Sequence, residues 1–185
     1  PSLFTGAALI FPSIASADVK LPTVIDSHMV LQRNTPLTIW GWADAGEEVT
    51  VKLGGSSAKA TAGEDGQWSV ELPAMKASRK SHSMTVTGNN EIKVEDILSG
   101  EVWVGSGQSN MEWQRQRTAG ATEAIKDADF KHIRLFHVPK VQAPSPANDV
   151  VADWKVCTPE NIPAFSGVLY YYGKKLHEEL DVPIG

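Results

Sequence analysis

The sequence predicts a mixed α/β protein in two parts, an antiparallel β-sandwich-like domain over residues 18–98 and an α/β region over residues 99–185. Before Gly100, short stretches of alternating polar and apolar residues are separated by turn residues, which is typical of small antiparallel sandwiches. After Gly100, apolar strand-like runs alternate with helix-like segments, which is the pattern of an α/β sheet. This change in pattern sets the predicted boundary between residues 98 and 99.

The strands of the first part are predicted from side-chain alternation. Val49, Val51 and Leu53 fall on one face of a strand, because successive side chains of a strand point to opposite faces. Gly54-Gly55 and Glu64-Asp65-Gly66 are turn signals on either side of the next strand. Further strands are expected at residues 37–42, 58–62, 68–72, 84–87 and 92–94.

The second part alternates predicted strands with predicted helices. Strands are expected at residues 102–105 and 133–138 and from residue 182, and helices from residue 109, over 121–128 and over 164–180. In the last helix, apolar residues recur at helical spacing, so we expect this stripe to face the core. The stripe consists of Phe165, Val168, Leu169, Tyr172, Leu176 and Leu180.

The composition argues against a nucleic-acid partner. The chain of 185 residues carries a net charge of −5 and has no block of like charge. Proteins that bind nucleic acids usually concentrate lysine and arginine on one face, so no such partner is predicted. Cys157 is the only cysteine, so no disulfide can form within the chain.

Residues 1–17 are predicted to be part of a secretory signal peptide. An uncharged apolar stretch over residues 3–14 is followed by Ala15-Ser16-Ala17, a small-x-small pattern that signal peptidases accept. A frayed apolar strand is the alternative. The stretch is shorter than the roughly 20 apolar residues that span a bilayer, so no membrane anchor is predicted. The chain starts at Pro1 without a basic region, so we expect this signal peptide to be partial and the protein to be secreted or periplasmic.

A glycine-rich segment, Gly105-Ser106-Gly107-Gln108-Ser109-Asn110-Met111, lies where a predicted strand passes into a helix. A serine at the carboxyl end of a parallel strand is exposed in the crevice where open α/β sheets bind ligands. Free N–H groups in the first turn of the helix can stabilise the oxyanion of an acyl-transfer intermediate. Ser109 is therefore a candidate nucleophile.

Three other interpretations of this segment compete. Residues 109–112 fit the S-x-x-E capping box, and the local pattern alone favours a helix cap over catalysis. A phosphate-binding or dinucleotide-binding loop is disfavoured, because the Gly-Lys-Ser/Thr ending of the first and the third glycine of the second are missing. Met111 stands where the G-x-S-x-G elbow of α/β-hydrolases has its second glycine, so that motif is not present.

Longer motifs around this segment resemble the sialate O-acetylesterase family, which belongs to the SGNH (GDSL-like) hydrolases. Residues 100–103 (Gly-Glu-Val-Trp) leading into residues 107–113 (Gly-Gln-Ser-Asn-Met-Glu-Trp) are similar to the nucleophile block of that family. Residues 28–33 (His-Met-Val-Leu-Gln-Arg) and 40–43 (Trp-Gly-Trp-Ala) resemble the β-domain that precedes the catalytic domain in many bacterial members. The similarity covers roughly residues 19–185 and includes Trp154, residues 157–160, residues 165–167 and residues 171–172.

The resemblance implies that residues 99–185 are the first part of an SGNH-type, three-layer α/β/α hydrolase domain. It also implies that Ser109 attacks an acetyl ester and that its own backbone N–H helps to form the oxyanion hole. Gln108 takes the place of the Asp in the GDS form of the block, and Asn110 is expected to order the loop. Both are candidate contacts to the substrate. The implied chemistry uses neither a metal nor another cofactor.

The other catalytic parts of the family match nothing in this sequence. The Asp-x-x-His segment that supplies the base is expected beyond Gly185, as are a further glycine and a polar side chain of the oxyanion hole. His132, His137 and His177 are outside any Asp-x-x-His pattern, so we expect each to be structural. We expect His28 to be a packing or turn residue of the β-domain.

The sequence thus predicts a secreted serine esterase that removes O-acetyl groups from a carbohydrate, and a chain that by itself lacks the catalytic His and Asp and is inactive. O-acetylated sialic acid and acetylated xylan or xylo-oligosaccharides are both open as substrates. An alternative of another class is a non-catalytic carbohydrate-binding β-sandwich that uses Trp40 and Trp42, although packing is the favoured role of these tryptophans. A purely structural spacer is a third interpretation. The oligomeric state is not predicted.

Overall fold

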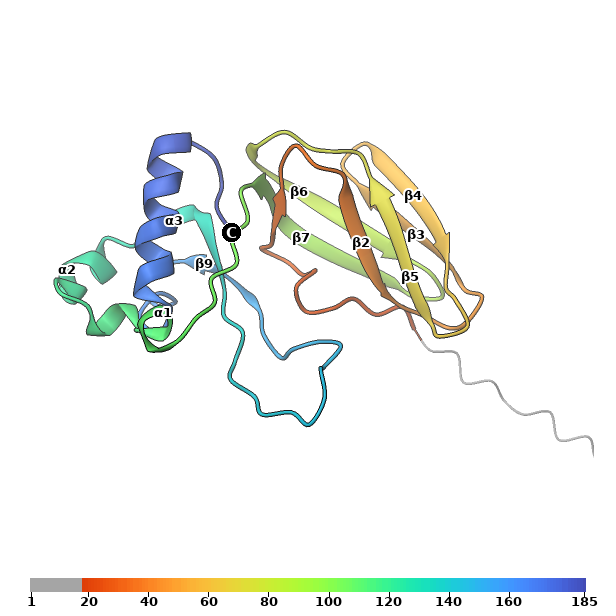
Figure 1. Cartoon of the computed structure of the whole chain (residues 1–185). Helices are drawn as coiled ribbons and strands as arrows, with labels where there is room; N and C mark the ends of the chain where they lie inside the picture. The colour runs from red at the N-terminus through yellow and green to blue at the C-terminus, as the bar shows by residue number, and fades with distance from the viewer. Residues whose placement is uncertain (1–17) are drawn as a thin grey trace, which may run out of the picture.

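The protein has a mixed α/β architecture dominated by strands (Figure 1). The computed structural model describes residues 18–185, so the predicted signal peptide at residues 1–17 lies outside the described residues. In chain order the elements are β1 (Val30–Gln32), β2 (Leu37–Trp42), β3 (Glu48–Leu53), β4 (Ser56–Thr61), β5 (Gln67–Leu72), β6 (Ser78–Thr87), β7 (Glu91–Gly100), α1 (Ser109–Glu112), a 3-10 turn (Arg115–Arg117), α2 (Ala121–Lys126), β8 (Phe130–Phe136), β9 (Trp154–Cys157) and α3 (Gly167–Leu180).

Strands β1 to β7 form two sheets. One has five strands in the order β1-β7-β6-β3-β4, and the other consists of β2 and β5. Every pairing in these sheets is antiparallel except that of β1 with β7, which is parallel. All the strands predicted for this part are present, and β6 and β7 extend beyond their predicted bounds. The short parallel strand β1 was not predicted.

The two sheets share one hydrophobic core. Val49 and Val51 of β3 have no exposed surface, in agreement with the predicted alternation. Ile39 of β2 and Val70 of β5 belong to the same buried cluster. Because burying a large apolar side chain contributes roughly 1.5–3 kcal/mol, these alternating faces are a main source of stability.

The second part contains a parallel arrangement of three chain segments. Ile184 bridges Glu101 on one side and Ile133 on the other, both in parallel. The N–H of Glu101 donates to the carbonyl of Pro183 over 2.9 Å, and the N–H of Gly185 donates to the carbonyl of Glu101 over 2.8 Å. The predicted third strand is thus present as a short paired segment. It ends between the helices and the strands of the first part (Figure 1).

The chain crosses from the first sheet into this arrangement at Gly100. Strand β7 runs through the predicted domain boundary and ends at Gly100, and Glu101 already pairs in parallel with the C-terminal segment. A Cβ at position 100 would lie 2.0 Å from the carbonyl oxygen of Pro183, so only glycine allows the two backbones to approach this closely. The division into two domains stays a prediction.

The two parts also pack through an aromatic side chain. Trp154 of β9 is buried in the core that the strands of the first part form. Its indole Nε1 donates to the carbonyl of Val24 over 2.9 Å. Strand β9 itself was not predicted, and it pairs antiparallel with β8.

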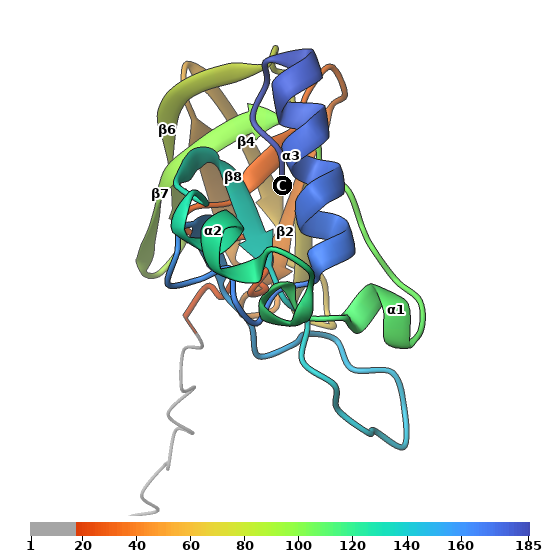
Figure 2. The same cartoon turned by 90° about the vertical axis from the view of Figure 1, so that its left-hand side faces the viewer.

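Helix α3 packs only partly through the predicted apolar stripe. Figure 2 shows α1, α2 and α3 on the side of the molecule that faces the viewer. The buried residues of α3 are Gly167, Tyr170 and Gly173, whereas Val168 and Tyr172 of the predicted stripe are 48% and 43% exposed. Phe165 of the stripe packs against the buried cluster that contains Tyr170. Periodicity shows where apolar side chains gather but not which neighbours they meet. An added Cβ at Gly167 would lie 2.8 Å from Cγ2 of Thr118, so this glycine allows the helix to pack closely there.

Residues 102–105 form a loop and not the predicted buried strand. Trp103 is 47% exposed and Val104 is 92% exposed. The backbone is hydrogen-bonded at the start of the segment, where the N–H of Trp103 donates to the carbonyl of Gly185 over 3.0 Å. Within residues 18–185, no helix is long and apolar enough to cross a bilayer.

Candidate active site

Ser109 is the first residue of α1 and lies at the wall of a groove. The loop after β7 positions Ser109 there. Residues 104–108 connect the paired segment at Glu101 to the start of the helix. Its side chain is exposed. Its backbone N–H belongs to the first turn, where helix geometry leaves N–H groups without an intrahelical partner. The geometry therefore offers an accessible hydroxyl next to a free backbone donor.

The structure does not support a capping role for Ser109. Gln108 is the N-cap residue of α1, and no side chain caps this helix end. The carbonyl of Gln108 instead accepts hydrogen bonds from the N–H groups of Met111 and Glu112. The capping-box interpretation, which the local pattern alone favoured, is therefore wrong.

The groove beside Ser109 has a volume of about 850 Å³. Its walls are residues 102–109, the end of β8 with the residues that follow it, and the start of α3. Much of the lining is apolar, and the rings of Trp103 and Tyr172 meet edge to face with centroids 5.2 Å apart. A mostly apolar cleft with a few polar groups is typical of a small-molecule site.

Gln108 and Asn110 flank Ser109 and are both exposed. Gln108 also lines the groove. Within residues 18–185 their side-chain amides have no hydrogen-bond partner, so both amides are free to meet a ligand. Their assignment as substrate contacts stays a prediction.

An ion pair lies at the rim of the groove. The carboxylate of Glu112 on α1 contacts the ammonium group of Lys140, and both residues line the groove. Lys140 belongs to the long irregular segment between β8 and β9. This pair ties that segment to the helix that carries Ser109, and because both side chains are exposed it contributes little to stability.

Arg115 lies completely buried beneath α3. Its guanidinium carbon lies 5.6 Å from the ring centroid of Tyr170 and 4.8 Å from that of Tyr171, which is the geometry of a cation–π contact. Its backbone N–H donates to the carbonyl of Phe165 over 2.8 Å. Burial raises the pKa of Tyr170 to about 12, so its hydroxyl stays protonated at neutral pH. Arg115 therefore fixes the chain after α1 against the start of α3.

His132 and His177 lie together, away from the groove. Their ring centroids are 6.1 Å apart, and Nδ1 of His177 lies 2.7 Å from the carbonyl oxygen of Val182. Burial and the nearby positive charge of Arg79 lower the pKa of His132. Neither residue lines the groove that holds Ser109. Their structural role stays a prediction.

His137 is the histidine that lines the same groove as Ser109. It is exposed, and its ring meets that of Phe165 edge to face at 6.3 Å. Within residues 18–185, no hydrogen bond joins the Ser109 hydroxyl to a histidine. In the same residues no group of three or more His, Cys, Asp or Glu side chains is arranged to hold a metal ion.

Trp40 and Trp42 lie side by side on β2 and do not form an open platform. Their rings meet edge to face with centroids 5.4 Å apart, and both side chains are more than half buried. Trp40 packs against the core of the first part. This arrangement fits the packing role and argues against sugar stacking on this strand.

Comparison with known proteins finds related acetylesterases. No family model matches the chain. It is 31% identical to the sialate O-acetylesterase of Rattus norvegicus over 191 residues, which cover 92% of this chain and 35% of the relative. It is 30% identical to the sialate O-acetylesterase of Homo sapiens over 214 residues, which cover all of this chain and 40% of the relative. A crystal structure of a carbohydrate acetylesterase from Xanthomonas citri superposes with a TM-score of 0.87 at 35% identity, covering 91% of this chain and 39% of that one.

The chain is a homologue of sialate O-acetylesterases over most of its own length. The predicted resemblance to these esterases is confirmed, and the chain spans 35% to 40% of the length of these relatives. Because the relatives are ester hydrolases by name, this similarity gives the exposed serine a chemical context that the groove alone does not supply.

Sequence reasoning missed a set of polar contacts between the family motif at residues 28–33 and the segment that leads to Ser109. Nε of Arg33 lies 2.6 Å from Oε1 of Glu101, and Nε2 of Gln32 lies 3.0 Å from Oε2 of the same carboxylate. Oε1 of Gln32 accepts a hydrogen bond from the N–H of Val102 over 2.9 Å. The motif itself was the available signal, but it did not reveal these partners.

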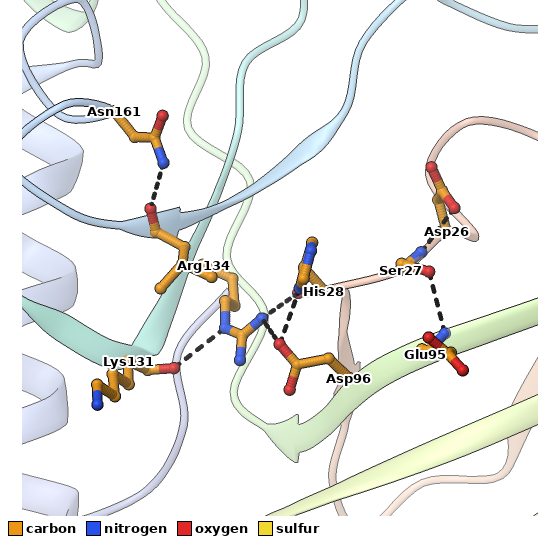
Figure 3. A network of polar contacts seen from close by, with 9 residues as sticks. Asp26, Ser27, His28, Glu95, Asp96, Lys131, Arg134 and Asn161 are labelled. Atoms are coloured by element: carbon orange, nitrogen blue, oxygen red, sulfur yellow. Dashed lines mark hydrogen bonds and ion pairs between the residues drawn. The ribbon is translucent and has the colours of Figure 1, made fainter.

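A second polar network joins the same motif to β8 (Figure 3). Nδ1 of His28 and Nη1 of Arg134 both contact Oδ2 of Asp96, at 2.8 Å and 2.6 Å. His28 has a φ of 71° and lies in a turn, so its predicted turn role is confirmed. This network joins the first part to the second at a point separate from the contacts of Gln32 and Arg33 with Glu101 and Val102.

Proposed function

We propose that this protein is a secreted, serine-dependent carbohydrate O-acetylesterase in which Ser109 is the nucleophile. The observation that carries the proposal is the placement of Ser109, which is exposed at the start of α1 on the wall of an 850 Å³ groove. The family relationship supports the reaction type. An apolar and aromatic lining such as that of Trp103 and Tyr172 suits the apolar faces of a sugar ring and the methyl group of an acetate.

The proposed reaction is acyl transfer through an acetyl-enzyme. Oγ of Ser109 attacks the acetyl carbonyl carbon while a general base takes the hydroxyl proton. The oxyanion that forms accepts a hydrogen bond from the backbone N–H of Ser109, which helix geometry leaves without a partner. The ester C–O bond then breaks and the sugar hydroxyl leaves with a proton. Water hydrolyses the acetyl-enzyme to acetate and restores the serine.

We also propose that none of the three histidines of the second part is the general base. His132 and His177 lie outside the groove, and the imidazole of His177 is already engaged by the carbonyl of Val182. His137 lines the groove but makes no hydrogen bond to Ser109. In a working triad the base is held within hydrogen-bond distance of the nucleophile, although apo geometry is often looser.

Variants of the full-length gene product test the nucleophile. Ser109→Ala should lower the rate of acetate release from acetylated sugars by roughly 10⁶-fold, as for other serine enzymes that lose their nucleophile. Ser69→Ala is the matched control, because Ser69 is an exposed serine on β5 in the first part. His137→Ala should keep most of the activity. Acetate release that survives in Ser109→Ala would disprove the proposal.

The substrate is proposed only at the level of an O-acetylated carbohydrate. The relatives are named for sialate and, more generally, for carbohydrate acetyl esters. Rates of acetate release from O-acetylated sialic acid and from acetylated xylo-oligosaccharides, measured on the full-length protein, would separate the two candidates. A protein that binds these sugars without releasing acetate would instead support the binding-module alternative.

For the architecture, we propose a sandwich-like domain over residues 18–98 and part of an SGNH-type hydrolase domain over residues 99–185. The shared core of the two sheets supports the first assignment, and the parallel bridges of Ile184 support the second. Limited proteolysis of the full-length protein should release a β-rich fragment that ends near the boundary.

For the location, we propose export with cleavage after Ala17. The proposal rests on the apolar stretch and on Ala15-Ser16-Ala17, which lie outside the described residues. N-terminal sequencing of material secreted from a host that carries the complete gene should begin at Asp18. A mature protein that retained residues 4–14 would contradict it.

A further inference from the structure

The loop that carries Ser109 is held mainly at its two ends. The N–H groups of Val104 to Gln108 have no hydrogen-bond partner within residues 18–185. At the far end, the N–H of Gly167 donates to the carbonyl of Trp113 over 2.8 Å, which fixes the chain after α1 to the start of α3. At the near end, the segment 101–103 is the fixed point. The position of that segment therefore sets where the loop begins.

The segment 101–103 is held from both sides. On one side, the N–H groups of Glu101 and Trp103 donate to the carbonyls of Pro183 and Gly185. The N–H of Val102 points the opposite way, as it must in an extended chain. No backbone carbonyl receives it.

A side chain of the first part receives that N–H. Oε1 of Gln32 accepts from Val102 over 2.9 Å, and the amide nitrogen of Gln32 donates to Glu101 over 3.0 Å. Gln32 is also the last residue of β1, whose pairing with β7 ends opposite Gly100. The Gln32 side chain thus continues the parallel pairing for one more step after the strands have separated.

Arg33 adds an ion pair to the contact between Gln32 and Glu101. Its Nε lies 2.6 Å from Oε1 of Glu101, and its backbone N–H donates to the carbonyl of Gly100 over 2.8 Å. The side chains of Arg33 and Glu101 are only 26% and 20% exposed, so their pairing is less screened than a surface ion pair. The hydrogen bonds from Gln32 and Arg33 lower the pKa of Glu101, which keeps the carboxylate ionised.

We propose that Gln32 and Arg33 are positioning residues of the esterase, which act through Glu101 and the Val102 N–H to fix the origin of the loop that carries Ser109. On this proposal the first part of the chain takes part in catalysis and is not an appended module. The inference rests on the proposed role of Ser109. Misplacing a nucleophile by about 1 Å can cost as much as 100-fold in rate, so a small shift at residues 101–102 has a measurable consequence.

The test measures the reactivity of Ser109 in folded, full-length protein. A fluorophosphonate probe that labels activated serines is followed in time, with the label mapped to Ser109 by mass spectrometry. Arg33→Met and Glu101→Gln should each label roughly tenfold more slowly at a temperature well below their unfolding midpoints. Arg33→Lys, which restores the positive charge, should recover part of the loss.

The matched control is Glu48→Gln on β3, which removes a carboxylate from an exposed ion pair with Lys59 far from the loop. It should label at the parental rate. A purely structural role for Arg33 and Glu101 would lower their unfolding midpoints but leave the labelling rate of the folded molecules within twofold of the parent, and this result would overturn the inference. If Arg33→Met does not fold, the labelling rate of Glu101→Gln tests the positioning role. This variant is expected to fold, because it keeps the shape of the side chain and an acceptor for Gln32.

The result also separates this inference from the proposed function. If the parent is labelled at Ser109 and the Arg33→Met and Glu101→Gln variants are labelled equally fast, the positioning role alone is wrong. If the parent shows no labelling that depends on Ser109, the nucleophile assignment fails and the positioning role fails with it.

Discussion

Nη1 of Arg134 on β8 donates to Oδ2 of Asp96 on β7 over 2.6 Å, and this contact joins the two parts of the chain (Figure 3). The guanidinium is nearly enclosed, with 4% of its side chain exposed, whereas 36% of the Asp96 side chain is exposed. Nε of Arg134 also donates to the carbonyl of Lys131 over 3.2 Å. A buried cation whose carboxylate partner is partly open to solvent makes the contact sensitive to pH and to mutation.

Asp96→Asn should lower the free energy of unfolding at neutral pH. In acid the variant and the parent should be about equally stable. Burial alone would raise the pKa of Asp96, but hydrogen bonds from Arg134 and His28 hold it below its ordinary value. A carboxyl with a lowered folded-state pKa adds stability above its unfolded pKa of about 3.9, and this stability is lost as the pH falls through the folded value.

The expected loss for Asp96→Asn at pH 7 is on the order of 1–2 kcal/mol, less than for a fully buried pair because solvent screens Asp96. Urea unfolding from pH 7 down to pH 3 would measure it, and the difference from the parent should shrink below about pH 4. Asp153→Asn, which removes the acid of an exposed pair with Lys155, is the control and should change little. A difference that stayed constant down to pH 3 would refute the assigned cause.

Gly100→Ala should destabilise the protein at the point where the chain passes from β7 to the segment that pairs with Ile184. The added methyl group would lie 2.0 Å from the carbonyl oxygen of Pro183, a backbone atom that cannot rotate away. We expect a loss of about 1–3 kcal/mol in the free energy of unfolding, as for other overpacked sites. Gly55→Ala is the control, since nothing lies within 4 Å of its added Cβ. Equal stability of the two variants would show that the close approach at Gly100 is wrong.

Cys157 should resist thiol reagents in the native state. It has no exposed surface, and burial raises its pKa to about 12. At pH 8 its thiolate is therefore much rarer than that of an ordinary thiol, and the thiolate is the reactive form. Labelling of Cys157 with a disulfide reagent, read by peptide mass spectrometry, should be negligible until urea unfolds the protein and then go to completion. Rapid labelling of the native protein would contradict the burial of Cys157.

A polypeptide of residues 18–185 should show no turnover that depends on Ser109. A serine hydroxyl is a weak nucleophile without a base beside it, and none of the histidines in this stretch is hydrogen-bonded to Ser109. Hydrolysis of an activated acetyl ester by this polypeptide, compared with its Ser109→Ala form, provides the measurement. Enzyme-like turnover that vanished in Ser109→Ala would mean that His137 acts as the base, since His137 lines the same groove.

The sequence by itself determined the strands of the first part and the candidate nucleophile. Alternation at Val49, Val51 and Leu53 is a local property, because side-chain direction in a strand follows from backbone geometry alone, and these residues are buried as predicted. The family was likewise readable from contiguous motifs, since the residues around Ser109 that carry the resemblance are neighbours in the chain.

The tertiary structure alone decided which surfaces meet. Phe165, Leu169 and Tyr172 of the apolar stripe line the groove, and the buried residues of α3 are Tyr170 and two glycines, because burial depends on the neighbours that the fold supplies. The partnership of Arg33 with Glu101 links residues 68 positions apart, and that of Arg134 with Asp96 links residues 38 positions apart. Such pairs leave no periodic signal in a single sequence, since an ion pair depends on two chain segments meeting in space and not on spacing along the chain.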